Sequence, residues 1–148
     1  MPGIFLTAAS TGETEALVIH CSSARMQQQF HAFLTGGLGL RKYCLVAVPG
    51  GVQALTLLDY LPKFSWAGWR WVKFLVDLEK PARVILIGHD ECAWYRDLRF
   101  WSRPRSSRER IIDDLRQTAR QVRERYQQAR VDCYFASIAG AEAVFEPV

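Results

Sequence analysis

The sequence predicts an α/β fold, a mostly parallel β-sheet of four to five strands with helices on both faces. Short apolar runs rich in β-branched residues recur along the chain, as is typical of strands that are covered on both sides. Longer stretches in which apolar residues follow helical spacing lie between these runs. Glycine and proline stand at the boundaries, and neither an internal repeat nor a linker divides the chain.

The composition indicates one globular domain that covers residues 1–148. The hydrophobic content of 49% and the charged content of 23% are ordinary for a folded protein and argue against disorder. No apolar run approaches the roughly 20 residues that a membrane helix needs, and residues 1–16 lack the basic start of a secretory signal. The four cysteines do not resemble a secreted disulfide framework. We therefore expect a cytoplasmic protein that is not associated with a membrane.

The first part of the chain is expected to form two strands with a helix between them. Residues 16–20 (ALVIH) form the first strand, and Cys21 follows directly. Ser22 or Ser23 can cap the next helix, because a side-chain oxygen there satisfies free amide groups of the first turn. That helix ends at a pair of glycines. Residues 43–48 (YCLVAV) then form the second strand, closed by a Pro-Gly-Gly turn.

The second part of the chain alternates in the same way. Helices are predicted over residues 52–62, 66–79 and 107–130. Strands are predicted over residues 84–87 (VILI), 131–136 (VDCYFA) and 143–146, the last two paired as a hairpin. Strands separated by helices imply a mostly parallel sheet.

Metal-binding side chains follow two of these strands. His89 and Cys92 come after the strand at 84–87, and their spacing of three lets both side chains approach one ion if a helix starts there. Cys21 follows the first strand, and the carboxyl ends of neighbouring parallel strands meet at one edge of a sheet. Two sulfurs and one imidazole suit zinc, and three protein ligands leave a fourth position open, as in catalytic sites. The alternative is that the cysteines are inert core residues.

Two motifs make the chain resemble the β-class carbonic anhydrases. The family's Cys-x-Asp-x-Arg segment corresponds to residues 21–25 (CSSAR), and its His-x-x-Cys segment corresponds to residues 89–92 (HDEC). The order of the predicted strands and helices is also similar over most of the chain. The resemblance implies that Cys21, His89 and Cys92 bind Zn²⁺ and that a zinc-bound hydroxide reversibly hydrates carbon dioxide to bicarbonate. It also implies a homodimer.

The chain departs from this family in the first motif. The family's aspartate is Ser23 here, and a serine can neither bind the metal as an anion nor form an ion pair with Arg25, the family's arginine. Asp90 or Glu91 could replace the aspartate by reaching Arg25 or the metal, and Asp90 is favoured because it adjoins His89. The alternative is that both are solvated acids near a helix start. The predicted catalytic residues are therefore Arg25, Ser23 and Asp90.

The other histidines and cysteines are expected to be structural. His20 precedes Cys21 on its strand, so its side chain points to the opposite face, as a core residue or as support for a ligand. His31 is expected at the surface rather than as a proton shuttle. Cys44 and Cys133 are expected to pack within strands.

Residues 96–130 support a hypothesis of another class. They contain 11 arginines and 5 acidic residues, so this segment could bind a polyanion or a partner protein, although no nucleic-acid motif accompanies it. The alternative is a solvated helix face, and nucleic acid is not the expected partner.

A further alternative to a carbonic anhydrase is a zinc-binding homologue that lacks hydration activity or acts on another small electrophile. Trp66, Trp69 and Trp71 span more than one helix face, so one of them is expected at the surface or against a second subunit.

Overall fold

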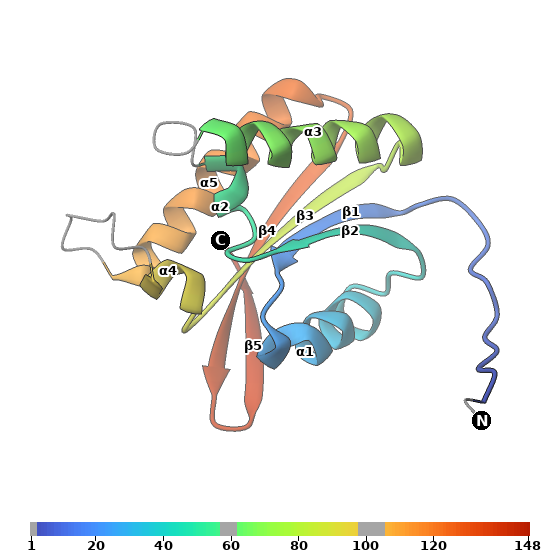
Figure 1. Cartoon of the computed structure of the whole chain (residues 1–148), viewed down its shortest axis with the longest axis horizontal. Coiled ribbons are helices and arrows are strands. Elements are labelled where there is room, and N and C mark those ends of the chain that lie inside the picture. The colour runs from blue at the N-terminus through green and yellow to red at the C-terminus, as the bar shows by residue number, and fades with distance from the viewer. Residues whose placement is uncertain (1–2, 57–61, 98–105) are drawn as a thin grey trace.

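Five strands form one twisted sheet in the computed structural model, which describes residues 3–56, 62–97 and 106–148. The strands are β1 (Ala16–Cys21), β2 (Tyr43–Val48), β3 (Arg83–His89), β4 (Arg130–Ala139) and β5 (Glu142–Pro147). Their order is β2-β1-β3-β4-β5. The first four are parallel, and β5 returns antiparallel to β4 (Figure 1). The predicted α/β class with a mostly parallel sheet is therefore confirmed.

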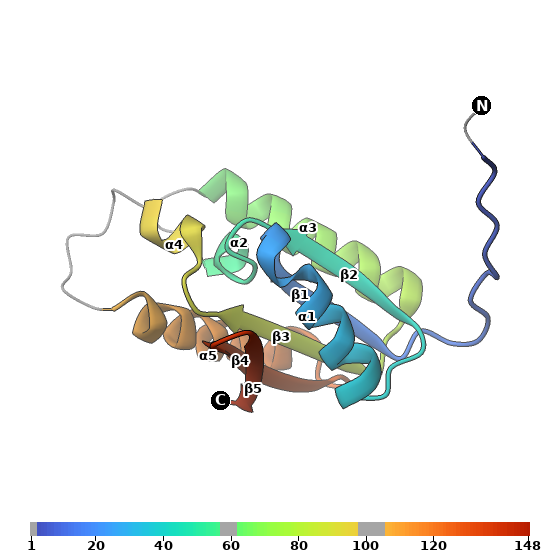
Figure 2. The same ribbon diagram turned by 90° about the horizontal axis from the view of Figure 1, so that it is seen from below.

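Helices cover both faces of the sheet (Figures 1 and 2). The helical segments are η1 (Ala24–Met26), α1 (Gln27–Ala32), η2 (Phe33–Gly37), α2 (Gln53–Thr56), α3 (Pro62–Glu79), α4 (Ala93–Asp97) and α5 (Ser107–Arg125). The longer helices α3 and α5 lie on one face together with α2, whereas α1 lies on the other (Figure 1). Among the described residues, no helix combines the length and the apolar character that crossing a bilayer requires.

The central strands explain the apolar runs of the sequence. All six residues of β1 are buried, and alternate side chains serve the two faces. Leu17 and Leu86 belong to the core beneath α3 and α5. Val18 and Ile85 pack in a second core around Phe30 of α1. A strand that is covered on both sides needs no polar face, so it appears in the sequence as an unbroken apolar run.

The structure corrects two predicted helix boundaries. Helix α3 begins at Pro62 rather than at residue 66, since proline is favoured at a first helical position, where no amide donor is needed. Of the predicted helix 52–62, the structure shows α2, and residues 57–61 lie outside the described residues. Helix α5 ends at Arg125 rather than at Arg130, because Arg130 starts β4 and its amide bonds Ala82.

The predicted serine cap is wrong. Ser23 stands before η1, but its side chain makes no capping hydrogen bond. The chain enters the helix through a tight turn, in which the backbone amide of Met26 bonds the carbonyl of Ser23 at 3.1 Å. The side-chain amide of Gln27 donates to the carbonyls of Ser23 and Cys21, at 2.7 and 3.0 Å. Backbone and glutamine therefore organise this turn.

Candidate metal centre

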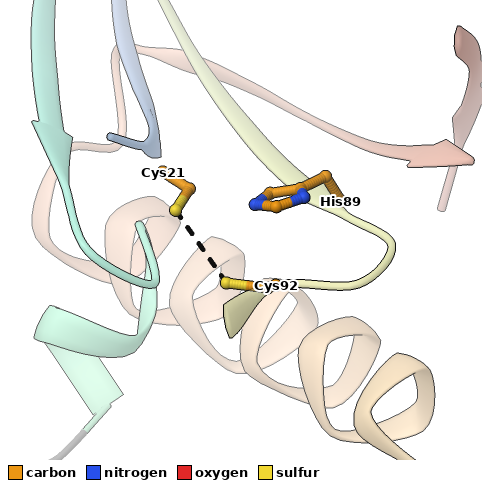
Figure 3. Close-up of side chains that lie close together, drawn as sticks. All are labelled: Cys21, His89 and Cys92. Carbon is orange, nitrogen blue, oxygen red and sulfur yellow. Dashed lines mark hydrogen bonds between the residues drawn. The ribbon is translucent and has the colours of Figure 1, made fainter. Parts of the chain in front are cut away.

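Three potential metal ligands meet at the carboxyl edge of the sheet. Cys21 ends β1 and His89 ends β3, and these strands are neighbours. Cys92 follows in the short turn before α4. The ligand atoms of the three residues all lie within 4.8 Å of one another, and all three residues are buried. The two sulfurs are 3.9 Å apart, with the imidazole of His89 beside them (Figure 3).

The imidazole of His89 is held in an orientation that suits a metal ligand. Its Nδ1 lies 2.7 Å from the carbonyl oxygen of Asp90, so Nδ1–H donates to that oxygen. Its Nε2 is buried and has no hydrogen-bond partner among the described residues. Metal-binding histidines commonly donate one ring N–H to a carbonyl and bind the metal through the other nitrogen. A buried nitrogen without a partner is costly, and a cation at this point would satisfy it.

The environment of the two thiols favours one negative charge. The thiol of Cys92 donates a hydrogen bond to the sulfur of Cys21 and thereby lowers the pKa of Cys21. Burial opposes this effect, whereas the side chain of His89 and the backbone amides of Gly50 and Ser23 support it. The neighbouring thiolate and burial raise the pKa of Cys92. A cation between the sulfurs would let the second thiol lose its proton as well.

Two glycines allow the surrounding backbone to come close. Gly51 has a φ of +58°, and a Cβ there would lie 3.0 Å from the backbone nitrogen of Cys21. A Cβ on Gly88 would lie 2.4 Å from Cγ2 of Ile111 and 3.1 Å from Cδ1 of Leu115. The turn after β2 and helix α5 can therefore pack directly against the strand ends that carry the donors.

An open pocket of about 510 Å³ adjoins Cys21. It is lined by Cys21, Ser22, Ser23, Pro49, Ala93, Trp94 and Asp97. A small molecule could thus reach the donor group from the solvent. Of the predicted catalytic residues, Ser23 lines this pocket.

The carboxylate that reaches Arg25 belongs to Glu91 rather than to Asp90. Nη1 of Arg25 lies 2.5 Å from Oε2 of Glu91. The side chain of Asp90 instead lies 3.9 Å from Arg108, and its backbone carbonyl accepts the bond from His89. Among the described residues, no carboxylate belongs to the donor group. Glu91 has a φ of +55°, a left-handed turn conformation that its sequence context does not reveal.

The remaining histidines lie outside the donor group. His20 is buried, stacks 4.2 Å from the ring of Phe30, and places Nδ1 2.8 Å from the carbonyl of Cys21. It thus supports the backbone of a donor residue, one of the two roles expected for it. His31 is exposed and bonds the hydroxyl of Tyr43 at 3.1 Å.

The remaining cysteines sit within strands. Cys44 lies in β2 and Cys133 in β4, as expected, and burial raises the pKa of each thiol to about 11. Thiols with so high a pKa are protonated at neutral pH and chemically inert.

The fold and the donor group define an α/β protein with a Cys-His-Cys cluster that could bind a metal ion at the carboxyl edge of a parallel sheet. No family model and no curated protein sequence matches the chain. Solved structures do match. A β-carbonic anhydrase from Trichomonas vaginalis is 14% identical with a TM-score of 0.56, and the match covers 95% of this chain and 87% of that one.

Two further structures agree with this match. For a tetrameric β-carbonic anhydrase from Sordaria macrospora the identity is 14% and the TM-score 0.54, over 90% of this chain and 81% of that one. For a carbonic anhydrase from Streptococcus mutans the values are 10% and 0.51, over 94% and 86%. The chain therefore has a divergent form of the β-carbonic anhydrase fold.

Proposed function

We propose that the chain binds Zn²⁺ through Cys21, His89 and Cys92 and catalyses the reversible hydration of carbon dioxide. The observation that supports this most is the buried Nε2 of His89, which has no hydrogen-bond partner in the described part of the chain and lies beside two sulfurs that are 3.9 Å apart. The fold is shared with proteins described as carbonic anhydrases. The proposed reaction is that of these neighbours.

The donor set fits zinc in number and kind. Two sulfurs and one imidazole nitrogen are soft to borderline ligands, and three protein ligands are typical of catalytic zinc sites. Held by these three residues, zinc would supply the Lewis acid that makes a hydroxide nucleophile available to carbon dioxide near neutral pH.

The residues of the chain would position and support this chemistry. The carbonyl of Asp90 holds the ring of His89 through Nδ1. Ser23 lines the pocket and can donate or accept a hydrogen bond there, but it carries no charge. Arg25 is held by Glu91. We assign Ser23 and Arg25 to orienting the substrate or product and Asp90 to orienting a ligand.

A second candidate is a zinc protein that lacks hydration activity or acts on another small electrophile. The specific observation in its favour is that a neutral serine stands in the pocket at the position of the family's aspartate. The partner of Arg25 is instead a half-exposed carboxylate. The acid that lines this pocket is Asp97 of α4, and among the described residues no carboxylate belongs to the donor group.

The polyanion-binding alternative receives less support. Several arginines of this segment are engaged within the protein. Arg108 lies 4.5 Å over the ring of Phe135, and Arg125 lies 3.9 Å over the ring of Trp69. Arg123 bonds a backbone carbonyl of β4 at 3.1 Å. These three side chains are therefore not free to contribute to a cationic surface.

Metal content and hydration rate should be measured on the same preparation. We expect about one tightly held zinc per chain, together with rapid hydration of carbon dioxide in a stopped-flow pH assay. Cys92→Ala should lose both, while Cys133→Ala, which removes a buried thiol of β4, should keep both. His89→Gln, with circular dichroism to check folding, serves as a second variant.

The outcomes separate the candidates. Zinc without hydration would favour the inactive or differently specific homologue. A folded wild-type protein that does not retain zinc would refute both zinc proposals.

A further inference from the structure

Among the described residues, Trp94 is the one large side chain in the lining of the pocket that adjoins Cys21. The other side chains of this lining are short, and they belong to Cys21, Ser22, Ser23, Pro49, Ala93 and Asp97. Trp94 lies in α4 and follows the donor residue Cys92 closely in the sequence. Its indole therefore has more influence on the width of the pocket than any other side chain of the lining.

The indole of Trp94 lies directly against the turn that follows β2. Gly50 in this turn has a φ of +77°, and a Cβ there would overlap Cδ1 of Trp94 and lie 2.9 Å from its Nε1. The lack of a side chain at Gly50 thus makes room for the ring. The ring also packs against the core beneath α3 and α5, and its Nε1 is buried. An indole that is held in this way forms a fixed wall of the pocket.

The contact between Trp94 and Gly50 joins the two chain segments that lie beside the donor sulfurs. The backbone amide of Gly50 bonds the sulfur of Cys21, and the backbone amide of Trp94 bonds the sulfur of Cys92. The donor residues are nearly closed off from the solvent, with exposed fractions of 6% for Cys21, 3% for His89 and 2% for Cys92. A molecule in the pocket therefore lies against the indole while it approaches Cys21.

We propose that Trp94 is the specificity-determining residue of this pocket: its indole admits molecules of a few heavy atoms to Cys21 and to a metal beside it, and it excludes larger ones. The proposal rests on the proposed function, because carbon dioxide and bicarbonate are small enough to pass, whereas aromatic and branched electrophiles are not. It also limits the second candidate function, since any other electrophile used there must be equally small. A rigid wall discriminates in this way because the larger molecule must overlap it or displace it.

Alkylation of Cys21 in the metal-free, reduced protein measures access to the donor group without zinc and without catalysis. Iodoacetamide and its N-benzyl derivative carry the same reactive carbon and differ in size. With either reagent the thiolate sulfur forms a bond to that carbon, iodide leaves, and the thiol proton passes to the buffer. Peptide mass spectrometry under argon gives the rate of modification at Cys21 for each reagent. Each rate is divided by the rate for free glutathione, and the quotient of the two normalised rates is the size selectivity.

In the wild-type protein the normalised rate with iodoacetamide should exceed the rate with the benzyl derivative by about tenfold or more. Trp94→Ala should lower this size selectivity roughly tenfold, whereas Trp94→Phe, which keeps a flat ring, should retain much of it. Trp94→Leu should lie between them, and it replaces the alanine variant if circular dichroism shows that the latter does not fold. Trp71→Ala is the matched control and should keep the selectivity of the wild type. Trp71 is exposed on α3, as the sequence predicts for one tryptophan of that helix, and it lines a separate groove.

A substitution at Gly50 tests the contact itself. Gly50→Ala places a Cβ where the indole of Trp94 lies, so it should displace the ring and lower the size selectivity. In the Trp94→Ala background the same change meets no indole, and it should not lower the selectivity further.

Three results would overturn the proposal. The first is a wild-type protein in which the two normalised rates are equal, and the second is a folded Trp94→Ala or Trp94→Leu variant with the full selectivity of the wild type. The third is a Cys21 that neither reagent modifies, because the pocket would then not lead to the donor group. Zinc content and hydration rate are measured separately on the same preparation. Selectivity without hydration would refute the proposed reaction alone, and hydration without selectivity would refute the role of Trp94 alone.

Discussion

The sulfur of Cys21 lies 3.9 Å from the sulfur of Cys92, although 71 positions separate the two residues in the sequence. Two thiols this close can be joined by a mild oxidant, which accepts two electrons while both thiols lose a proton. A cation bound to both sulfurs would prevent this reaction, because their electron pairs would be engaged.

Oxidation should therefore depend on the metal. We expect a chelator-treated protein to form a Cys21–Cys92 disulfide with diamide, and a zinc-loaded protein to resist it. Peptide mapping by mass spectrometry identifies the bond, and Cys44 and Cys133 serve as internal controls. Equal oxidation with and without zinc would contradict a metal at these sulfurs.

A second prediction concerns the contact between Gly88 and α5. Gly88→Ala should destabilise the protein by about 1–3 kcal/mol, because the new Cβ would overlap Ile111 at the end of β3. Gly36→Ala, where a Cβ meets nothing within 4 Å, should change the free energy of unfolding by only about 0.5 kcal/mol or less. Urea denaturation measures both. Ile111→Ala in the Gly88→Ala background should relieve the overlap, and additive losses would argue against it.

The ion pair between Arg25 and Glu91 supports a third prediction. Arg25 lowers the pKa of Glu91 through a hydrogen bond and its positive charge. If this pair orients Arg25 for the reaction, Glu91→Gln should slow hydration severalfold at unchanged zinc content. Arg25→Ala should add little in the Glu91→Gln background, since the two residues act as a unit. Equal and additive effects of the two changes would show that the pair has no joint role.

The neighbouring acid, Asp90, serves as the control for the substitution of Glu91. Its side chain points to Arg108, and only its backbone carbonyl touches His89. Asp90→Asn should therefore affect hydration less than Glu91→Gln does.

The raised pKa of Asp114 predicts that the stability of the protein depends on pH. Burial raises its pKa to about 6, although the hydroxyl of Tyr95 donates a bond to it at 2.6 Å. Between about pH 4 and pH 6 the folded chain thus keeps a proton that the unfolded chain has lost, so this group lowers the stability as the pH rises. Above the pKa of the folded state the loss is complete and is on the order of 3 kcal/mol.

Asp114→Asn isolates this contribution. The free energy of unfolding of metal-free wild-type and variant protein should be compared by urea titration at pH 4.5 and pH 7. Other titrating groups are common to both proteins, so the wild type should lose more stability than the variant between these two values. The same pH dependence in both proteins would contradict the raised pKa.

Much of the fold was predictable because the signals were local. The unbroken apolar run of β3 is typical of a strand covered on both sides, and its position between two helices favours a parallel arrangement. The spacing of three between His89 and Cys92 likewise predicted, from the sequence alone, that both side chains approach one ion. Their meeting with Cys21 required only that β1 and β3 be neighbours, which the sheet order confirms.

Other features depend on conformations that residue types do not determine. Glu91 rather than Asp90 pairs with Arg25, and Glu91 has a left-handed backbone conformation. The residue types alone do not predict that conformation. The end of α5 at Arg125 reflects competition between helix propensity and pairing of β4 with β3, which tertiary contacts decide. The hydrogen bonds of Gln27 to two carbonyls were also beyond sequence reasoning, because a glutamine has no fixed preference for such a place.

The adjacency of β1 and β3 has a consequence for how the protein folds. The polypeptide between them builds β2 and α3 before it returns to the centre of the sheet. A large loop must therefore close before the two cysteines and the histidine can meet, which carries an entropic cost in the unfolded chain. An ion held by all three would bind only the completed topology and shift the equilibrium toward it by mass action. Metal uptake would then be a late step in maturation, and its rate would report when the sheet has assembled.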